Sequence, residues 1–157
     1  GFKELIELGW IEDKMPRMVS VQSTGCAPIV RAWEGGHEFA EYWEDAETIS
    51  SGIRVPSALG DFMILDAVRS SGGFAISVTD EQTLEIQHQI GLSEGLLLCP
   101  EGAATVAAYR NSLESGLVSS DESVVLFNTA TGLKYPMPEV TSSIDKNDVE
   151  YSVFKTK

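Results

Sequence analysis

Cysteine and basic side chains are scarce in this 157-residue chain, and it contains no long apolar run. The two cysteines, Cys26 and Cys99, are far apart and lie in apolar surroundings. This argues against a disulfide scaffold and for two buried thiols in a reducing compartment. No stretch reaches the roughly 18 consecutive apolar residues that a membrane-spanning helix needs. We therefore expect a cytoplasmic protein that does not span a membrane.

Positive charge is also scarce. The chain has 24 acidic and 11 basic side chains, a formal net charge of -13. Such a chain repels phosphate backbones and anionic lipid, so nucleic acid and membrane surfaces are not expected partners. The acidic residues are scattered, with no block of like charge, which is typical of a solvated surface.

Several motifs that carry chemistry are absent. The sequence contains no glycine-rich nucleotide-binding motif, no H-E-x-x-H zinc motif and no G-x-S-x-G nucleophile elbow. The cysteines lack zinc spacing, and the two histidines, His37 and His88, are predicted to lie in a loop and on a helix. The pattern favours structural roles for these residues, and we expect no metal site.

What the chain does have is an alternation of short apolar runs and amphipathic segments. Strands are predicted at 17–22, 74–78, 96–99 and 123–128, and helices at 27–33, at 61–70, from 80 to about 90 and from 100 to 113. This alternation is typical of βαβ units. It predicts an α/β fold, a three-layer sandwich with a mainly parallel sheet flanked by helices.

Local signals support these helices. The sequence Thr79-Asp80-Glu81-Gln82 has the spacing of a capping box, and Pro100 followed by Glu101 suits the first turn of a helix. The helix at 61–70 carries apolar residues at helical spacing and is followed by a pair of glycines. Its expected buried stripe consists of Phe62, Leu65 and Val68, with Ile64 and Ala67.

Residues 1–9 and 34–54 are less regular. The first nine residues have helical spacing of apolar side chains and end at Gly9, but they contain neither an initiating Met nor a cap. This indicates the last turns of a helix in a longer polypeptide. Residues 34–54 are polar and contain glycine, which predicts an extended loop with one short helix around 38–43.

Ligands of parallel α/β sheets bind beyond the carboxyl ends of the strands. The segment 129–132, Thr-Ala-Thr-Gly, follows the last predicted strand and so places hydroxyl groups at that edge. From spacing alone, an ordinary turn with hydroxyl caps is the favoured explanation. Glu101 follows another predicted strand, where it fits either a general base or a carboxylate that complements a helix dipole.

The run 124–136, Val-Val-Leu-Phe-Asn-Thr-Ala-Thr-Gly-Leu-Lys-Tyr-Pro, resembles the closing motif of threonine synthase, in which a strand ends in threonine and Gly-Leu-Lys follows. Other segments fit the family in the right order: 1–3, 21–30, 48–55, 71–73 with 78–81, and 100–105. The resemblance implies the C-terminal part of a fold-type-II pyridoxal-phosphate enzyme. Residues 1–136 then belong to its larger domain, and 137–157 form a polar tail that is either a late strand or irregular.

The resemblance also implies an activity and a cofactor. The family converts O-phospho-L-homoserine and water into L-threonine and phosphate with pyridoxal 5'-phosphate. Its closing threonine, matched by Thr129, hydrogen-bonds the pyridine nitrogen of the cofactor. A neutral hydroxyl does not hold that nitrogen protonated as a carboxylate would, which moderates the ring as an electron sink. Gly52 and Ile53 resemble a stretch that passes close to the ring, and Thr131 has a supporting role.

Two parts of the family's active site have no counterpart in this sequence. The lysine that forms the Schiff base and the glycine-rich loop that cradles the cofactor phosphate both belong to the family's amino-terminal half, and no lysine here matches the lysine motif. We therefore expect no catalytic residue in this chain, weak cofactor binding and no turnover by the chain alone. The full-length protein is expected to be a homodimer that acts on a small amino-acid substrate.

Two other interpretations stay open. A sibling fold-type-II enzyme such as threonine dehydratase closes its last strand with a Ser-Gly-Gly or Pro-Asp-Ser-Gly pattern, which the sequence at 128–134 fits poorly. The chain could instead be a non-catalytic acidic α/β domain that binds a small molecule or a partner. The helical pattern at its first residues argues against an independent module.

Overall fold

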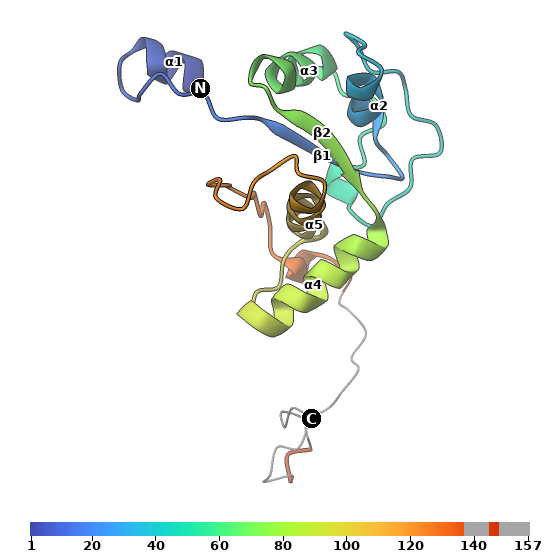
Figure 1. Ribbon diagram of the computed structural model, residues 1–157. Helices are drawn as coiled ribbons and strands as arrows, with labels where there is room; N and C mark the ends of the chain where they lie inside the picture. The colour runs from blue at the N-terminus through green and yellow to red at the C-terminus, as the bar shows by residue number, and fades with distance from the viewer. Residues whose placement is uncertain (137–144, 148–157) are drawn as a thin grey trace.

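The computed structural model describes residues 1–136 and 145–147. The predicted tail, including its possible strand, therefore lies outside the described residues apart from 145–147. Figure 1 shows the arrangement of the elements. In chain order they are α1 (Phe2–Glu7), β1 (Val19–Ser23), α2 (Pro28–Glu34), the 3-10 helix η1 (Ser51–Ile53), α3 (Asp61–Ser70), β2 (Phe74–Val78), α4 (Asp80–Glu94), α5 (Pro100–Glu114) and the 3-10 helix η2 (Gly132–Lys134).

The sheet of the described residues consists of β1 and β2, which pair in parallel from Val19 with Phe74 to Ser23 with Val78. Parallel strands need a long connection to return the chain to the same end of the sheet. Here the connection contains α2, η1 and α3. The strand from 74 to 78 has the predicted bounds, and the first strand is shifted from the predicted 17–22 to 19–23.

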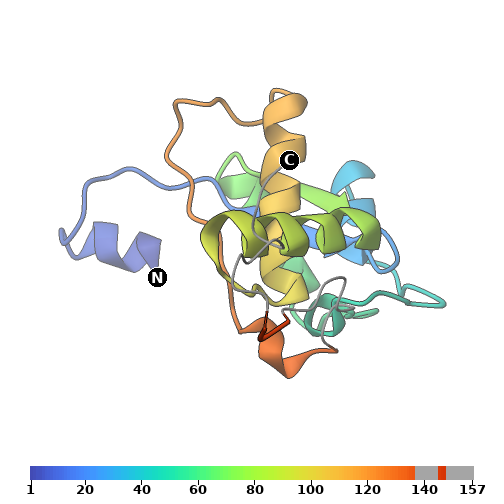
Figure 2. The ribbon, with the colours of Figure 1, turned by 90° about the horizontal axis from the view of Figure 1, so that it is seen from below.

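Helices cover both faces of this sheet. Alternate residues of a strand point to opposite faces, so Ala75 packs with α2 and α3, whereas Ile76 and Val78 pack with α4 and α5. Figure 1 shows the two helix pairs on opposite sides of the strands, and Figure 2 shows α4 crossing α5. The predicted α/β class, with a parallel sheet between helical layers, is confirmed.

The ends of the helices follow from the sequence. Thr79 forms the predicted capping box with Gln82: its hydroxyl accepts from the Gln82 amide, and the Gln82 side chain accepts from the Thr79 amide. The helix α4 ends at Gly95, which has a φ of 67° that favours glycine. It is thus one turn longer than predicted. Gly72 ends α3 with a φ of 67° in the same way.

The first helix, α1, lies apart from the layers in both ribbon views (Figures 1 and 2). It contains no buried residue. The helix predicted from residues 1–9 is therefore present, with none of its apolar side chains fully buried. None of the described helices has the length and apolar character needed to cross a membrane.

Two predicted strands are wrong. Residues 96–99 and 123–128 are not strands; Leu98 only forms an isolated bridge with Thr131. Apolar runs become strands when a neighbouring strand pairs with their backbone groups, and neither run has one among the described residues. Consequently Val125 and Phe127, which were expected in a buried strand, are largely exposed.

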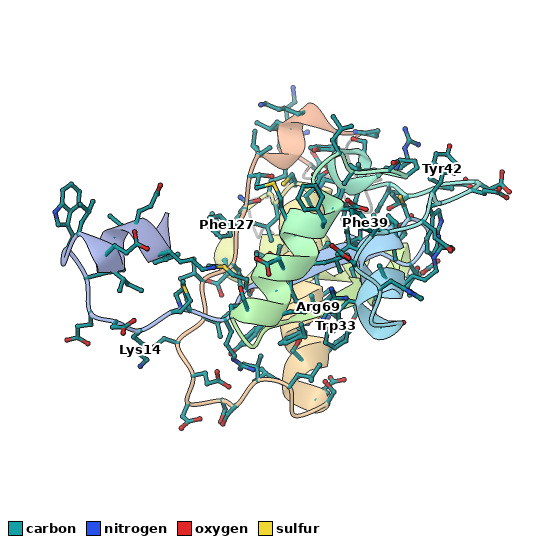
Figure 3. The ribbon with its side chains drawn as sticks, turned by 90° about the horizontal axis from the view of Figure 1, so that it is seen from above. Lys14, Trp33, Phe39, Tyr42, Arg69 and Phe127 are labelled. Carbon is teal, nitrogen blue, oxygen red and sulfur yellow. The ribbon has the colours of Figure 1, made fainter. Side chains whose placement is uncertain are left out.

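The helix predicted around 38–43 is also absent, because contacts hold this stretch extended. The Arg31 guanidinium donates to the carbonyl oxygens of Glu41 and Tyr42 at 3.1 and 3.0 Å. In a helix, such carbonyl oxygens would accept from backbone amides four residues further along the chain. Here they accept from the Arg31 side chain instead. Nearby, Phe39 lies beside α3, with its ring centroid 6.0 Å from that of Phe62 (Figure 3).

This position of Phe62 corrects the expected buried stripe of α3. Only Leu65 and Val68 of the stripe are buried, whereas Phe62, Ile64 and Ala67 are exposed. A surface helix usually buries three to four residues per two turns, and α3 buries only two. The core on this side of the sheet therefore depends strongly on Leu65.

We expect Leu65→Ala to lower the free energy of unfolding by about 2–5 kcal/mol, because Leu65 is 0% exposed and its truncation leaves a cavity. Leu59→Ala, at a fully exposed leucine, is the matched control and should change stability by less than about 0.5 kcal/mol. Urea unfolding followed by circular dichroism measures both. Equal effects of the two substitutions would contradict this assignment of the core.

Candidate functional site

A cavity of about 240 Å³ opens between the sheet, the start of α5 and the segment that follows α5. Its walls come from β1, η1, the first two turns of α5 and the stretch 127–135. The lining residues are Val21, Gly52, Ile53, Glu101, Thr105, Phe127, Thr129 and Tyr135. Phe127, labelled in Figure 3, belongs to the extended segment after α5. Segments far apart in the sequence thus meet here.

Glu101 connects several of these walls. It lies in the first turn of α5, where helix ends favour negative charge, and it is 8% exposed. Its Oε1 accepts a hydrogen bond from the Gly52 amide, and its Oε2 accepts one from the Tyr135 hydroxyl, each at 2.6 Å. Charge-assisted contacts of this length are among the stronger hydrogen bonds in proteins. One carboxylate therefore holds η1 and the Tyr135 region to the helix.

The same contacts set the charge of the cavity wall. Burial pushes the pKa of Glu101 upward, but hydrogen bonds from the Tyr135 hydroxyl and from backbone amides outweigh burial, so its pKa lies below the ordinary value. In return, hydrogen bonding to Glu101 and then burial raise the pKa of Tyr135 to about 12. At neutral pH the wall therefore carries a carboxylate and a neutral phenol.

Thr129 reaches the cavity through the packing of its segment on α5. The buried Cys99 caps the helix: its Sγ accepts from the Gly102 amide at 3.2 Å, donates to Asn128 Oδ1 at 3.4 Å and lies 3.8 Å from Thr129 Oγ1. A Cβ on Gly102 would meet the Asn128 side chain and come within 3.2 Å of its Cα. Glycine at this position lets the segment carrying Thr129 lie against the first turn of α5.

A second polar network lies at the carboxyl ends of β1 and β2. Asp80 Oδ1 accepts from the hydroxyls of Ser23 and Thr48 at 3.2 and 2.6 Å. Its Oδ2 accepts from the Ile49 amide at 2.9 Å. These bonds fix the stretch that leads into η1. Within that stretch, the Ser50 hydroxyl is buried and has no hydrogen-bond partner in the described part of the chain.

The structure brings together three of the four residues singled out from the sequence. Thr129, Gly52 and Ile53 line the same cavity. Thr131 is not among its lining residues; its Oγ1 accepts from the Leu133 amide at 3.4 Å and so caps η2. Their proposed contacts with a cofactor stay predictions.

The other lining residues differ in how far the sequence indicates them. The sequence makes Glu101 a candidate base or helix-dipole partner, but it does not predict the contacts with Gly52 and Tyr135. Thr105 could have been found, because it follows Glu101 by four residues and thus shares its helix face. No signal in the sequence predicts that Phe127 reaches this cavity.

Comparison with known proteins identifies the family. Residues 1–130, most of the chain, match the family model described as pyridoxal-phosphate dependent enzyme. The chain belongs to this family. Its cofactor is pyridoxal 5'-phosphate, and the resemblance noted in the sequence is confirmed.

Curated threonine synthases are similar to this pyridoxal-phosphate enzyme chain. That of Methanocaldococcus jannaschii is 35% identical over 150 residues, which cover 96% of this chain and 37% of the relative. That of Methanosarcina acetivorans is 38% identical over 136 residues, covering 87% of this chain and 33% of the relative. The chain thus spans about a third of the length of the curated relatives it matches.

A solved structure supports the fold. The threonine deaminase of T.th. aligns with a TM-score of 0.50 and 23% identity, over 64% of this chain and 35% of that one. At this identity the likeness concerns the fold alone. It agrees with the α/β layers described above.

The cavity suits the ring of pyridoxal 5'-phosphate in size and lining. A cavity of about 150 Å³ holds benzene, and this one measures about 240 Å³. Val21, Ile53 and Phe127 give it apolar walls, and Thr129 contributes a hydroxyl. Apolar walls with a few placed polar groups are typical of cofactor sites.

We expect Tyr135 to titrate near pH 12, about two units above ordinary tyrosine. The pKa is raised in the folded protein, so the stability from the Glu101 contact is complete below about pH 10 and is lost as the pH rises through 12. The difference in ultraviolet absorbance between the wild type and Tyr135→Phe reports this titration. Glu101→Gln, which removes the charge, should shift it to lower pH. A midpoint near pH 10 in the wild type would contradict the contact.

Proposed function

We propose that this chain is part of a threonine synthase, which converts O-phospho-L-homoserine and water into L-threonine and phosphate. The observation that carries the proposal is the position of Thr129, on the wall of a cavity that suits a pyridine ring. The similarity to curated threonine synthases along 96% of the chain supports it. The Asn-Thr-Ala-Thr-Gly-Leu-Lys sequence at this wall agrees with the closing motif of that family.

In this proposal, Thr129 holds the pyridine nitrogen of the cofactor through its hydroxyl. A hydroxyl can donate to an unprotonated nitrogen, whereas a carboxylate would favour the protonated ring. Gly52 and Ile53, which line the same cavity, lie along the ring. Thr131 supports Thr129 indirectly by capping η2. When bound, pyridoxal 5'-phosphate supplies an electron sink for the chemistry of the amino-acid substrate.

The other residues of the cavity prepare its environment. Val21, Ile53 and Phe127 give the ring apolar walls. Glu101 connects two further walls through its hydrogen bonds with the Gly52 amide and the Tyr135 hydroxyl. The Schiff-base lysine and the phosphate-cradling loop are assigned to a part of the protein that this sequence does not contain. The homodimer and the cytoplasmic location also stay predictions.

Thr129→Val should weaken binding of pyridoxal 5'-phosphate about fivefold to tenfold, because one hydrogen bond of about 1 kcal/mol is lost without a change in side-chain volume. Thr129→Ser keeps the hydroxyl and should retain binding. Thr131→Val is the matched control, since its hydroxyl serves η2 instead of the cavity. Absorbance titration with cofactor, using the protein expressed from the complete gene, measures the affinities. Equal losses at positions 129 and 131 would refute the assignment.

The reaction itself can be tested by supplying two substrates. The protein from the complete gene should release phosphate and threonine from O-phospho-L-homoserine and should not deaminate threonine at a comparable rate. This chain expressed alone should show no turnover, because no lysine in it matches the Schiff-base motif. Deamination of threonine without phosphate release would instead assign the protein to threonine dehydratase. An inert complete protein that binds no cofactor would favour a non-catalytic domain.

A further inference from the structure

Glu101 is an unusual residue in this chain because its charge is buried. Among residues 1–136 and 145–147, it is the one Asp, Glu, Lys or Arg residue that is buried. It forms no ion pair within those residues. Buried charges persist where hydrogen bonds replace the lost water. At Glu101 these hydrogen bonds come from Gly52 and Tyr135, which lie on two other walls of the cavity. The residue therefore connects three walls of the site.

We propose that Glu101 is a positioning residue, which holds Gly52 and Tyr135 at the spacing that the ring of the bound cofactor requires. We call the three residues the Tyr135–Glu101–Gly52 clasp. The inference rests on the proposed function, because it assumes that the cavity takes the ring of pyridoxal 5'-phosphate. It adds to the proposed function a role for Glu101 and Tyr135, which shape the cavity through the hydrogen bonds between its walls.

The geometry of the clasp is restrictive. Each carboxylate oxygen accepts from one donor, the Gly52 amide or the Tyr135 hydroxyl, both at 2.6 Å. The width of one carboxylate thus sets the separation of the two donors. A Cβ on Gly52 would come within 2.8 Å of Oε1 and push the carboxylate away. The clasp therefore needs glycine at 52, independently of any contact between this residue and the cofactor.

The contacts also argue against a role for Glu101 as a general base. A base must have a free oxygen facing the proton that it removes. Both Glu101 oxygens already accept short hydrogen bonds, and a carboxylate stabilised in this way is a weak proton acceptor. Holding the walls in place is the function that its contacts allow.

The test separates the negative charge of Glu101 from the hydrogen bonds that its side chain forms. In Glu101→Gln the amide oxygen can accept from Gly52 while the amide nitrogen donates to the Tyr135 oxygen, which can accept as well as donate. This variant keeps the clasp without its charge. Glu101→Ala removes both contacts, and Tyr135→Phe removes one. Glu122→Ala is the matched control, since Glu122 is an exposed carboxylate paired with Arg17 and is not among the lining residues.

Affinity for pyridoxal 5'-phosphate and the absorbance of the bound cofactor are measured for the protein from the complete gene. We expect Glu101→Gln and Glu122→Ala to bind within about twofold of the wild type. We expect losses of about fivefold for Tyr135→Phe and more than tenfold for Glu101→Ala, following the number of hydrogen bonds removed. Rescue by glutamine is the result that distinguishes positioning from a requirement for charge.

The outcomes separate this inference from the proposed function. A wild-type protein without bound-cofactor absorbance would end the proposed function itself. A wild type that binds, together with unchanged affinity in Glu101→Ala, would overturn the clasp alone. Glutamine as damaging as alanine would also overturn it. Should Glu101→Ala fail to fold by circular dichroism, Tyr135→Phe decides, because wild-type affinity in that variant is incompatible with the clasp.

Discussion

The first turn of α5 receives contacts from segments that are distant in the sequence. Cys99 and Gly102 bring the segment with Asn128 and Thr129 against the helix, and Glu101 binds the backbone of η1 and the Tyr135 hydroxyl. A helix N-terminus offers unpaired amides and a positive dipole end, which explains why a carboxylate is tolerated in this buried place. The cavity exists because these segments meet at one helical turn.

Small side chains let that turn approach the sheet. The face of α5 that packs against the strands is built from alanines, at positions 103, 104, 107 and 108, and all of them are buried. Alanine favours a helix and keeps the distance between helix and strand short. The strand residue Val21 can therefore line the same cavity as Glu101 and Thr105. The shape of the cavity thus depends both on apolar packing of α5 against the strands and on the polar contacts at the start of this helix.

Sequence reasoning succeeded where local signals decide the structure. The capping box at Thr79, the proline and glutamate at the start of α5 and the strand at 74–78 all act over a few residues. It failed at 96–99 and 123–128, since pairing of an apolar strand depends on a neighbour that the run itself does not specify. For the cavity, a motif indicated Thr129, Gly52 and Ile53. The contact between Glu101 and Tyr135 spans 34 positions, and no local pattern encodes it.

The bonds at Asp80 have a consequence for the pairing of the strands. Asp80 lies two residues after the end of β2 and accepts from Ser23, the last residue of β1. A slip of one position between the strands would turn the Ser23 side chain to the other face of the sheet. The slipped chain would then lose the hydrogen bond between Ser23 and Asp80. The same carboxylate also accepts hydrogen bonds from the Thr48 hydroxyl and the Ile49 amide. The register of the strands is thus tied, through Asp80, to the loop that carries η1 to the cavity.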